Sequence, residues 1–340
     1  MGAETPRIAF FGAMSLFAKE VRSVLESRAV ASETVKLYDA KQEGTVTEFA
    51  GEALLVTRPD EEEVAGLDIA FLCGTAAETV PYLDWPARRG YVAIDLTGAS
   101  RDRAGVPIVH NEINPEAISG EDGALRPIIG APHPVSHNLA SIVAGLRGAG
   151  TVTSVEALAL RPASDLGDSG IDELYQQTVA LLNFSSVPQE VFGRQLAFNI
   201  LPSAGVDTSR AESFDERIRD ETVRVLDMRP DQVSVASAFV SMFHGHAIAA
   251  TVNFDRPPNP AALKESMVAF RGITLLEDPS VGSPAEVAGE DNLAVVGLRP
   301  DARRPATVRL WSFCDNLRSG AALNAVRIAE RVLDSRRAGR

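Results

Sequence analysis

Residues 7–18 read RIAFFGAMSLFA, and this stretch indicates most clearly how the chain begins to fold. A short apolar run ends in Gly12, and from Phe17 to Leu25 the apolar residues recur at helical spacing. This order of features predicts a strand, a tight turn and a helix. A chain that opens in this way is typical of α/β proteins built on parallel strands.

Apolar runs at Thr34–Tyr38, Leu67–Gly74 and Tyr91–Leu96 continue the pattern. A helical stretch from Ala76 to Arg88 lies between the last two of these runs, so strands and helices alternate. Alternation of this kind predicts a parallel sheet with right-handed crossovers. We therefore expect an N-terminal Rossmann-type parallel-sheet domain.

The pattern changes after residue 132. Long strand patterns cover Val152–Leu160, Val233–Val240 and His246–Phe254, and the clearest helical patterns cover Ile171–Phe184 and Glu216–Leu226. Long strands without regular helical crossovers predict an antiparallel or mixed sheet on which helices pack. The second domain is therefore expected to be of the α+β class.

The last apolar pattern, Gly320–Leu333, has helical spacing and predicts a helix that returns to the first domain. We expect residues 1–132 with 316–340 to form the dinucleotide-binding domain and residues 133–315 to form the inserted domain. A chain of 340 residues also exceeds the size at which one core usually stops growing.

Composition excludes some classes of partner. The formal net charge of −13 argues against nucleic acid and against an anionic membrane surface, because both attract lysine and arginine. No apolar run approaches the roughly 20 residues that span a membrane. Two distant cysteines, Cys73 and Cys314, give no disulfide framework, which favours a reducing cytoplasm.

The turn after the first strand is a candidate dinucleotide loop with one unusual residue. Gly12 and Ala18 stand at the first and third positions of the glycine fingerprint, but Ser15 stands at the middle one. A side chain at Ser15 occupies space where phosphate would approach the backbone. The loop predicts either a nucleotide site with weakened phosphate contact or a domain that no longer binds a nucleotide.

Asp39, at the end of the second strand, could accept the ribose hydroxyls of NAD and would disfavour a 2'-phosphate. Lys41 favours the phosphate of NADP instead. Gly74, at the end of the third strand, is a further candidate cofactor contact.

Residues 315–325 read DNLRSGAALNA, which resembles the DNLRKGAALNA signature of aspartate-semialdehyde dehydrogenases. The resemblance extends over nearly the whole chain, from Gly12 to Ala325. It implies that the inserted domain serves dimerisation and substrate binding, and hence a homodimer. It also implies NADP as the usual cofactor and a cofactor contact at Asn316.

The same resemblance exposes an unusual residue at the expected reaction centre. Residues 128–136 read IIGAPHPVS and match the family's IIANPNCST, which places Pro134 where the family has its nucleophilic cysteine. Proline has no nucleophile, so the thiol-dependent phosphorylating activity is expected to be absent. Cys73 and Cys314 are expected to pack as small apolar residues, and Ser136 is a weaker candidate nucleophile.

Other family positions are partly kept. His246, in the run GHAI, corresponds to the family's acid/base histidine, and Arg101 corresponds to its phosphate-binding arginine. Arg161 and Arg217 stand where the family has glutamine and lysine, and they remain candidates for binding substrate or phosphate. Phe239 replaces the arginine that holds the substrate carboxylate, which favours a more apolar ligand.

The histidines support a further hypothesis. His133 and His137 have i, i+4 spacing and His244 and His246 have i, i+2 spacing, both of which suit zinc ligands on one face of a helix or strand. Pro134 interrupts the first pair, and the resemblance already accounts for His246. A metal site is therefore the less favoured interpretation.

Three functions remain open from the sequence. The first is a silent or repurposed homologue without the thiol-dependent phosphorylating activity. The second is an NAD(P)-dependent oxidoreductase for a different, more apolar substrate, with His246 as acid/base and Arg101 as anion anchor. The third is a dimeric interaction protein or a metal-binding protein.

Overall fold

The computed structural model describes residues 5–30, 34–206, 213–278 and 280–338. Two compact units divide the chain: Met1–Pro132 with Ala321–Arg340, and His133–Gly320. The return to the first unit thus lies between residues 320 and 321, rather than between 315 and 316. An irregular π-helical turn over Arg318–Ala322 precedes the last helix and spans this boundary.

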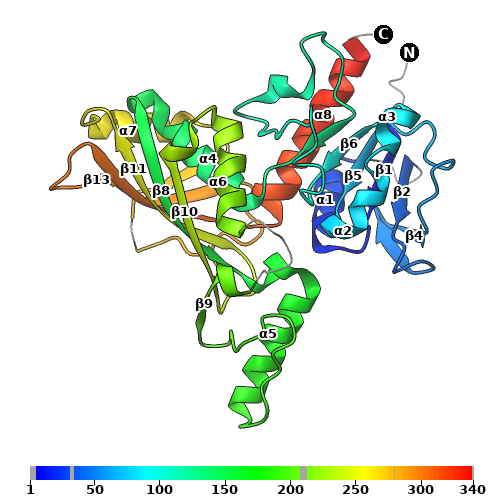
Figure 1. The fold of residues 1–340 in the computed structure, drawn as a ribbon, viewed down its shortest axis with the longest axis horizontal. Coiled ribbons are helices and arrows are strands. Elements are labelled where there is room, and N and C mark those ends of the chain that lie inside the picture. The colour runs from blue at the N-terminus through cyan, green and yellow to red at the C-terminus, as the bar shows by residue number, and fades with distance from the viewer. Residues whose placement is uncertain (1–4, 31–33, 207–212, 279, 339–340) are drawn as a thin grey trace. The chain divides into compact units, whose positions relative to one another are not determined.

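The sheet of the first unit has the strand order β3-β4-β2-β1-β5-β6-β7 (Figure 1). β3 and β4 form an antiparallel hairpin, and the other neighbouring strands are parallel. This arrangement confirms the Rossmann-like α/β fold. The strands are β1 (Ile8–Phe11), β2 (Val35–Tyr38), β3 (Val46–Phe49), β4 (Glu52–Thr57), β5 (Ile69–Leu72), β6 (Val92–Asp95) and β7 (Ile128–Gly130).

The helix expected over residues 76–88 is wrong in one respect. The structure has two short helices here, α2 (Ala76–Thr79) and α3 (Trp85–Arg89), with a 3₁₀ turn between them. Pro81 and Pro86 each stand in the first turn of a new element. Because proline cannot donate a backbone hydrogen bond, it starts a helix readily but does not continue one.

Helices α1 (Leu16–Ser27) and α8 (Leu323–Ala338) share one core in the first unit. Val326, Ile328 and Val332 of α8 are fully buried in it. Asn324 fixes the start of α8, because its side chain donates to Val109 O and accepts from Asn111 N. The end of the chain therefore completes the domain that the start of the chain begins.

The second unit is built on a mixed sheet with the order β12-β13-β14-β11-β8-β10-β9. β8 runs parallel to β10 and antiparallel to β11. This agrees with the α+β class predicted for the inserted domain. The strands are β8 (Val152–Arg161), β9 (Ile200–Pro202), β10 (Val233–Val240), β11 (His246–Phe254), β12 (Ile273–Leu276), β13 (Leu293–Pro300) and β14 (Thr307–Cys314).

Helices cover one face of this second sheet. α4 (Pro134–Leu146), α6 (Phe214–Leu226) and α7 (Pro260–Ala269) lie side by side on it, whereas α5 (Gly167–Leu182) extends away from the sheet (Figure 1). Among the described residues, no helix is both long and apolar enough to cross a membrane.

The opposite face of the second sheet carries exposed apolar side chains at its centre. Leu158, Ala249 and Trp311 stand in register on the neighbouring strands β8, β11 and β14. Leu158 and Trp311 are each 42% exposed. Large apolar side chains in register across an uncovered sheet indicate a surface that packs against another surface.

Candidate functional site

The loop after β1 packs directly against the loop after β5. Gly12 has φ +72°, and a Cβ at this position would lie 2.3 Å from Gly74 N. The Gly12 N–H donates to Tyr38 O, which ties the same loop to the end of β2. Only a glycine at position 12 allows this close approach, so the carboxyl ends of three parallel strands meet where a dinucleotide binds in this fold.

Ser15 acts as the N-cap of α1. Its Oγ accepts a hydrogen bond from Ala18 N over 3.2 Å. Capping by serine stabilises a helix, but it also uses one of the N–H groups that could bind phosphate at a helix N-terminus.

The loop after β2 carries both charges predicted to select the cofactor. Asp39 Oδ1 accepts from the backbone N–H groups of Lys41 and Gln42 at 3.0 and 3.2 Å. Lys41 Nζ pairs with Glu78 Oε1 of α2 at 2.6 Å. Glu78 was not identified from the sequence, and its negative charge compensates that of Lys41.

Arg101 lies in the loop that follows β6. The Asp95 carboxylate fixes this loop, because it accepts hydrogen bonds from the backbone and hydroxyl groups of Thr97 and Ser100. The Arg101 side chain is buried and pairs with the neighbouring Asp102 at 3.2 Å.

A buried group of charges lies in the second unit, at the ends of β8 and β11. His246 Nε2 lies 2.9 and 3.1 Å from the two carboxylate oxygens of Asp165. Arg161 Nε donates to Asp165 Oδ2 over 2.8 Å. Arg161 and His246 were both predicted as site residues from the sequence, and the structure brings them together. The Asp165 carboxylate that joins them was not predicted.

Local structure explains how these three residues meet. Arg161 ends β8, Asp165 lies in the 3₁₀ turn that follows, and His246 begins β11, which pairs with β8. The Arg161 guanidinium lies 3.4 Å from the ring centroid of Phe214 and 4.2 Å from that of Phe239. Phe239 therefore supports a cation by cation–π contact.

The pair of Asp165 and His246 is strongly coupled. Burial lowers the pKa of the His246 ring, but the Asp165 carboxylate and the Cys314 thiol outweigh burial and raise the pKa to about 9. Burial likewise raises the pKa of Asp165, but His246 and Arg161 hold it well below its ordinary range. Asp165 is thus ionised at neutral pH, and His246 has a high affinity for a proton.

Asn316 holds the loop that leads into His246. Its Oδ1 accepts from Gly245 N over 2.8 Å, and its Nδ2 donates to Ser164 Oγ over 3.1 Å. The side chain was predicted to contact a cofactor. In the structure it is fully buried in the second unit and positions both partners of the Asp165–His246 pair.

Pro134 is the first residue of α4, and His133 is its N-cap. Pro134 packs closely under the glycine of the 315–325 motif, since a Cβ at Gly320 would lie 2.9 Å from Pro134 Cβ. His133 Nδ1 accepts from Val135 N over 3.2 Å. Proline suits this first helical position because it needs no N–H there.

A second buried carboxylate joins α4 to α6. Glu221 Oε2 accepts from His133 N at 2.6 Å and from Ser136 Oγ at 2.8 Å, while Oε1 pairs with Arg217 Nε at 2.8 Å. The Ser136 hydroxyl donates to a carboxylate rather than to a histidine, so Ser136 lacks the base expected for a serine nucleophile. Arg217, like Arg161, pairs with an internal carboxylate.

The four histidines are only partly brought together. The His133 and His246 rings lie 5.8 Å apart, and burial lowers the pKa of His133 well below 6.5. His137 is half-buried and His244 is exposed. Within the described ranges, no three His, Cys, Asp or Glu side chains are placed to hold a metal ion. The geometry gives the metal hypothesis no support.

The two cysteines differ in their surroundings. Cys73 is buried in the core of the first unit, where burial raises the pKa of its thiol. Cys314 lies opposite His246 in the register of β11 and β14, and its Sγ accepts from Asn138 Nδ2 over 3.5 Å. Both are buried as the sequence predicts, but Cys314 has polar neighbours.

Models of two families match the chain. The semialdehyde dehydrogenase NAD binding domain matches residues 7–121, and the semialdehyde dehydrogenase dimerisation domain matches residues 143–319. The chain belongs to the semialdehyde dehydrogenase family.

Individual relatives of this family align over almost the whole chain. The aspartate-semialdehyde dehydrogenase of Rickettsia bellii is 27% identical and covers 96% of this chain and 97% of its own. The USG-1 protein homolog of Pseudomonas aeruginosa is 28% identical over 87% of this chain and 88% of its own. The structure of aspartate semialdehyde dehydrogenase II from Vibrio cholerae, complexed with ASA, has a TM-score of 0.89 at 26% identity and covers 98% of this chain and 99% of its own.

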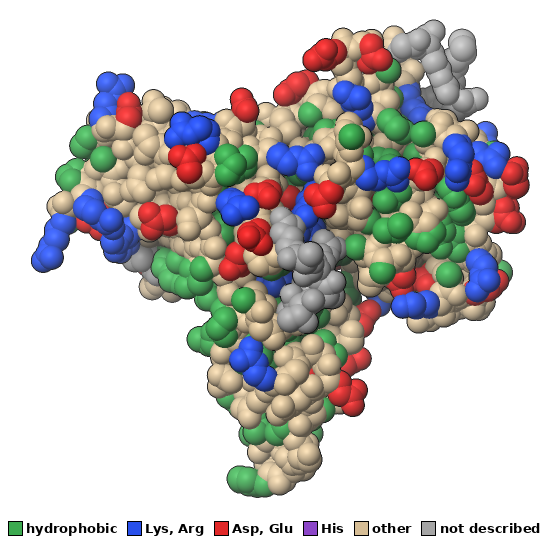
Figure 2. All heavy atoms as spheres, viewed as in Figure 1, with side chains coloured by type: hydrophobic (Ala, Val, Ile, Leu, Met, Phe, Trp, Pro, Cys, Tyr) green, Lys and Arg blue, Asp and Glu red, His purple; other side chains and the backbone are tan. Residues whose placement is uncertain are grey.

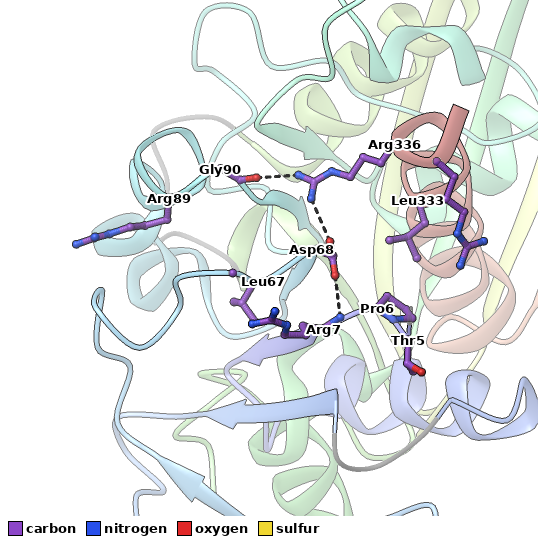
Figure 3. Close-up of a pocket in the computed structure, with 11 residues that line it drawn as sticks. Thr5, Pro6, Arg7, Leu67, Asp68, Arg89, Gly90, Leu333 and Arg336 are labelled. Atoms are coloured by element: carbon purple, nitrogen blue, oxygen red, sulfur yellow. Dashed lines mark hydrogen bonds and ion pairs between the residues drawn. The ribbon is translucent and has the colours of Figure 1, made fainter. Parts of the chain in front are cut away.

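One cleft lies away from the residues that the family resemblance points to. It has a volume of about 520 Å³ and opens at the amino ends of β1, β5 and β6 (Figure 3). Arg336 crosses it, donating to Gly90 O over 2.9 Å and lying 3.4 Å from Asp68 Oδ1. Dinucleotides bind at the carboxyl ends of parallel strands, so this cleft is at the wrong edge for the cofactor.

Proposed function

We propose that this chain is a repurposed aspartate-semialdehyde dehydrogenase-like oxidoreductase that does not carry out the phosphorylating reaction through a thiol at residue 134. The observation that carries this proposal is Pro134 itself, packed as the first residue of α4 under Gly320. No side chain there can attack a carbonyl carbon. The reaction must therefore depend on other groups of the second unit.

His246 is the proposed acid/base. Asp165 orients the ring and stabilises its protonated form, which is the role of the carboxylate in other histidine–carboxylate pairs. A raised pKa lets His246 hold a proton at neutral pH and deliver it to a carbonyl oxygen. This chemistry suits reduction of a carbonyl group or its reverse.

The first unit fits a nicotinamide dinucleotide. Gly12 and Gly74 leave room for a close approach to the backbone, and α1 begins directly after this turn. Bound there, the cofactor would supply or accept the hydride. Since Ser15 already bonds Ala18 N, we expect the phosphate contact to be weaker than in a complete glycine fingerprint.

We propose NAD rather than the NADP implied by the family resemblance. The Glu78 carboxylate neutralises the positive charge of Lys41. The remaining charge in this loop is the negative charge of Asp39. A 2'-phosphate would be repelled there, whereas ribose hydroxyls could donate to the Asp39 carboxylate.

The proposed substrate is a carbonyl compound more apolar than aspartate semialdehyde. Arg161 and Arg217 pair with Asp165 and Glu221 inside the unit, so a substrate carboxylate would compete with these internal pairs. Phe239 is fully buried beneath Arg161 and offers no charge.

A homodimer is the proposed assembly, formed by the open face of the second sheet. Leu158 and Trp311 give this face an apolar centre, and the matched model for this part of the chain describes a dimerisation domain.

The melting temperature with saturating NADH and with saturating NADPH tests the cofactor proposal. A ligand that binds only the folded state raises the melting temperature by mass action. We expect NADH to raise it by several degrees and NADPH to raise it less. No shift with either cofactor would instead support a silent homologue.

Turnover provides the second test. We expect oxidation of NADH with an apolar aldehyde such as butanal, and no phosphate-dependent oxidation of aspartate semialdehyde. His246→Asn should lower butanal turnover by about a hundredfold, the usual contribution of general acid catalysis. His244→Asn is the matched control, because His244 is exposed two residues away. Robust phosphate-dependent turnover of aspartate semialdehyde would contradict the proposal.

A further inference from the structure

The cleft at the amino ends of β1, β5 and β6 is basic, although the chain as a whole is acidic. Its volume of about 520 Å³ is within the range of sites that bind small molecules. The net charge of the chain is −13, but positive charge dominates the cleft. Among the described residues that line it, the charged ones are Arg7, Asp68, Arg89, Arg336 and Arg337.

The Asp68 carboxylate of the lining is already paired. Its Oδ2 accepts from Arg7 N over 2.9 Å, and its Oδ1 lies 3.4 Å from Arg336 Nη1. Arg336 also donates to Gly90 O over 2.9 Å, so its guanidinium joins α8 to the residues that precede β5 and β6 (Figure 3). Because Arg336 offsets Asp68, the net positive charge of the cleft comes from the other arginines.

Arg7 supplies a guanidinium group that pairs with no carboxylate. Arg7 is exposed directly before β1, and a Cβ at Gly66 would lie 2.8 Å from its Nη1. Within the described part of the chain, its side chain forms no ion pair. Basic residues in the last turn of a helix commonly offset the helix dipole, which would account for Arg336 and Arg337 of α8. That reason does not apply to Arg7, because it precedes a strand.

The other two arginines pair with carboxylates that face solvent. Arg337 Nη1 lies 3.4 Å from Asp334 Oδ1, and the Asp334 side chain is 75% exposed. Arg89 pairs with Glu62, whose side chain is 80% exposed. Exposed ion pairs contribute little to stability, so a bound anion can replace either carboxylate at small cost.

We propose that this cleft binds a small organic phosphate. Guanidinium groups match phosphate oxygens with paired N–H donors. A phosphate monoester has three terminal oxygens, so it can accept from Arg7 and Arg337 together, although they belong to separate elements. The organic part of the ligand would contact the apolar lining residues Pro6, Leu67 and Leu333.

The cleft is separate from the proposed cofactor loop. Gly12 and Gly74 follow the carboxyl ends of β1 and β5, whereas Arg7 and Asp68 precede their amino ends. β1 has four residues, and a strand of that length spans about 13 Å. The organic phosphate would therefore bind together with the cofactor, and this site does not depend on the proposed oxidoreductase function.

Calorimetric titration of the intact protein with glycerol 2-phosphate, at constant ionic strength, tests the cleft. We expect saturable binding both without and with NADH. Arg7→Gln and Arg337→Gln should each weaken binding by about tenfold, because each removes a charge-assisted hydrogen bond. Both side chains are exposed, and melting temperatures establish that the variants are folded. Lys36→Gln is the matched control, since it removes one positive charge from an exposed residue of β2 outside the cleft.

The same titrations define the results that would overturn this site. The absence of saturable binding at millimolar concentrations is one such result. Equal weakening by Lys36→Gln would show a general attraction of the anion to positive charge rather than a site. Succinate is also a dianion, and equally tight binding of succinate would overturn the phosphate class. Binding that NADH abolishes and Arg7→Gln leaves unchanged would place the anion in the cofactor loop. A protein that does not bind NADH would still give the expected effects of Arg7→Gln and Arg337→Gln, so the two proposals can fail separately.

Discussion

At the residue level, the buried Asp165–His246 pair couples stability to pH. The pKa of His246 rises from 6.5 to about 9 on folding, so its stabilising contribution is complete below pH 6.5 and is lost as pH rises through about 9. We expect the free energy of unfolding to fall by up to about 3 kcal/mol between about pH 6 and about pH 10. Urea denaturation at the two pH values measures this difference.

Asp165→Asn is the variant that isolates this effect. It keeps the shape of the side chain but leaves Arg161 and His246 without their shared carboxylate. We expect a loss of about 3–5 kcal/mol at neutral pH, because the buried Arg161 guanidinium is left without its counter-ion. The stability difference between pH 6 and pH 10 should also shrink markedly. An unchanged pH dependence would show that another group titrates.

Gly12→Ala tests the close approach of the loops after β1 and β5. The new Cβ would lie 2.3 Å from the backbone of Gly74 at a φ of +72°. Gly44→Ala is the matched control, since Gly44 has φ +84° and open space around it. Thermal unfolding should show Gly12→Ala to be less stable than the control by about 2 kcal/mol, and the NADH-induced shift should be lost only in Gly12→Ala.

Sequence reasoning identified His246, Arg161 and Pro134 but missed the carboxylates that hold them. Asp165 meets His246 across 81 residues of chain, and Glu221 meets His133 across 88. Pairings over such distances leave no local pattern. The one available signal is the i, i+4 spacing of Arg161 with Asp165 and of Arg217 with Glu221. The polar neighbours of Cys314 could not be predicted, because they depend on the register of two strands.

At the level of elements, the strongly apolar strands and the longer helices could be predicted from periodicity. The β3–β4 hairpin could not, because its turn lacks the usual signal. Ala50 and Gly51 form it with φ of 52° and 81°, and alanine rarely adopts this conformation. Asparagine in place of Ala50 would have given the Asn-Gly pair that is typical of two-residue hairpin turns.

The open face of the second sheet yields an element-level prediction. Leu158→Asp should convert the dimer to monomer, because it places a charge in the apolar centre of the proposed interface. Val268→Asp is the control, since Val268 is 63% exposed on α7, which covers the opposite face. Sedimentation velocity measures the mass of each. A wild-type protein that is monomeric at micromolar concentration would contradict the proposed assembly.

For the whole molecule, the proposed cofactor loop belongs to the first unit and the buried polar cluster to the second. Acidic and basic side chains are interspersed on the face drawn in Figure 2, in keeping with a net charge of −13 and no extended basic surface there. The two-unit organisation could be predicted because strand spacing changes near residue 132. The exact return point could not, because the π-helical turn at Arg318–Ala322 has no marker in the sequence.

A chain that stops after Gly320 tests this division. It lacks α8, whose residues Val326, Ile328 and Val332 are fully buried in the first unit. We expect the first unit to lose its NADH response and become sensitive to protease, while the second unit stays resistant. A chain ending at Ala338 serves as the control. Retention of NADH binding without α8 would show that the first unit is stable alone.

The late position of α8 also sets an order of events during synthesis. Proteins usually fold from the N-terminus as they leave the ribosome. Here the first 132 residues emerge early but lack the helix that completes their core, whereas residues 133–320 contain their whole unit. We expect the middle of the chain to mature first on the ribosome, and the N-terminal residues to remain open to chaperones until the last codons are translated.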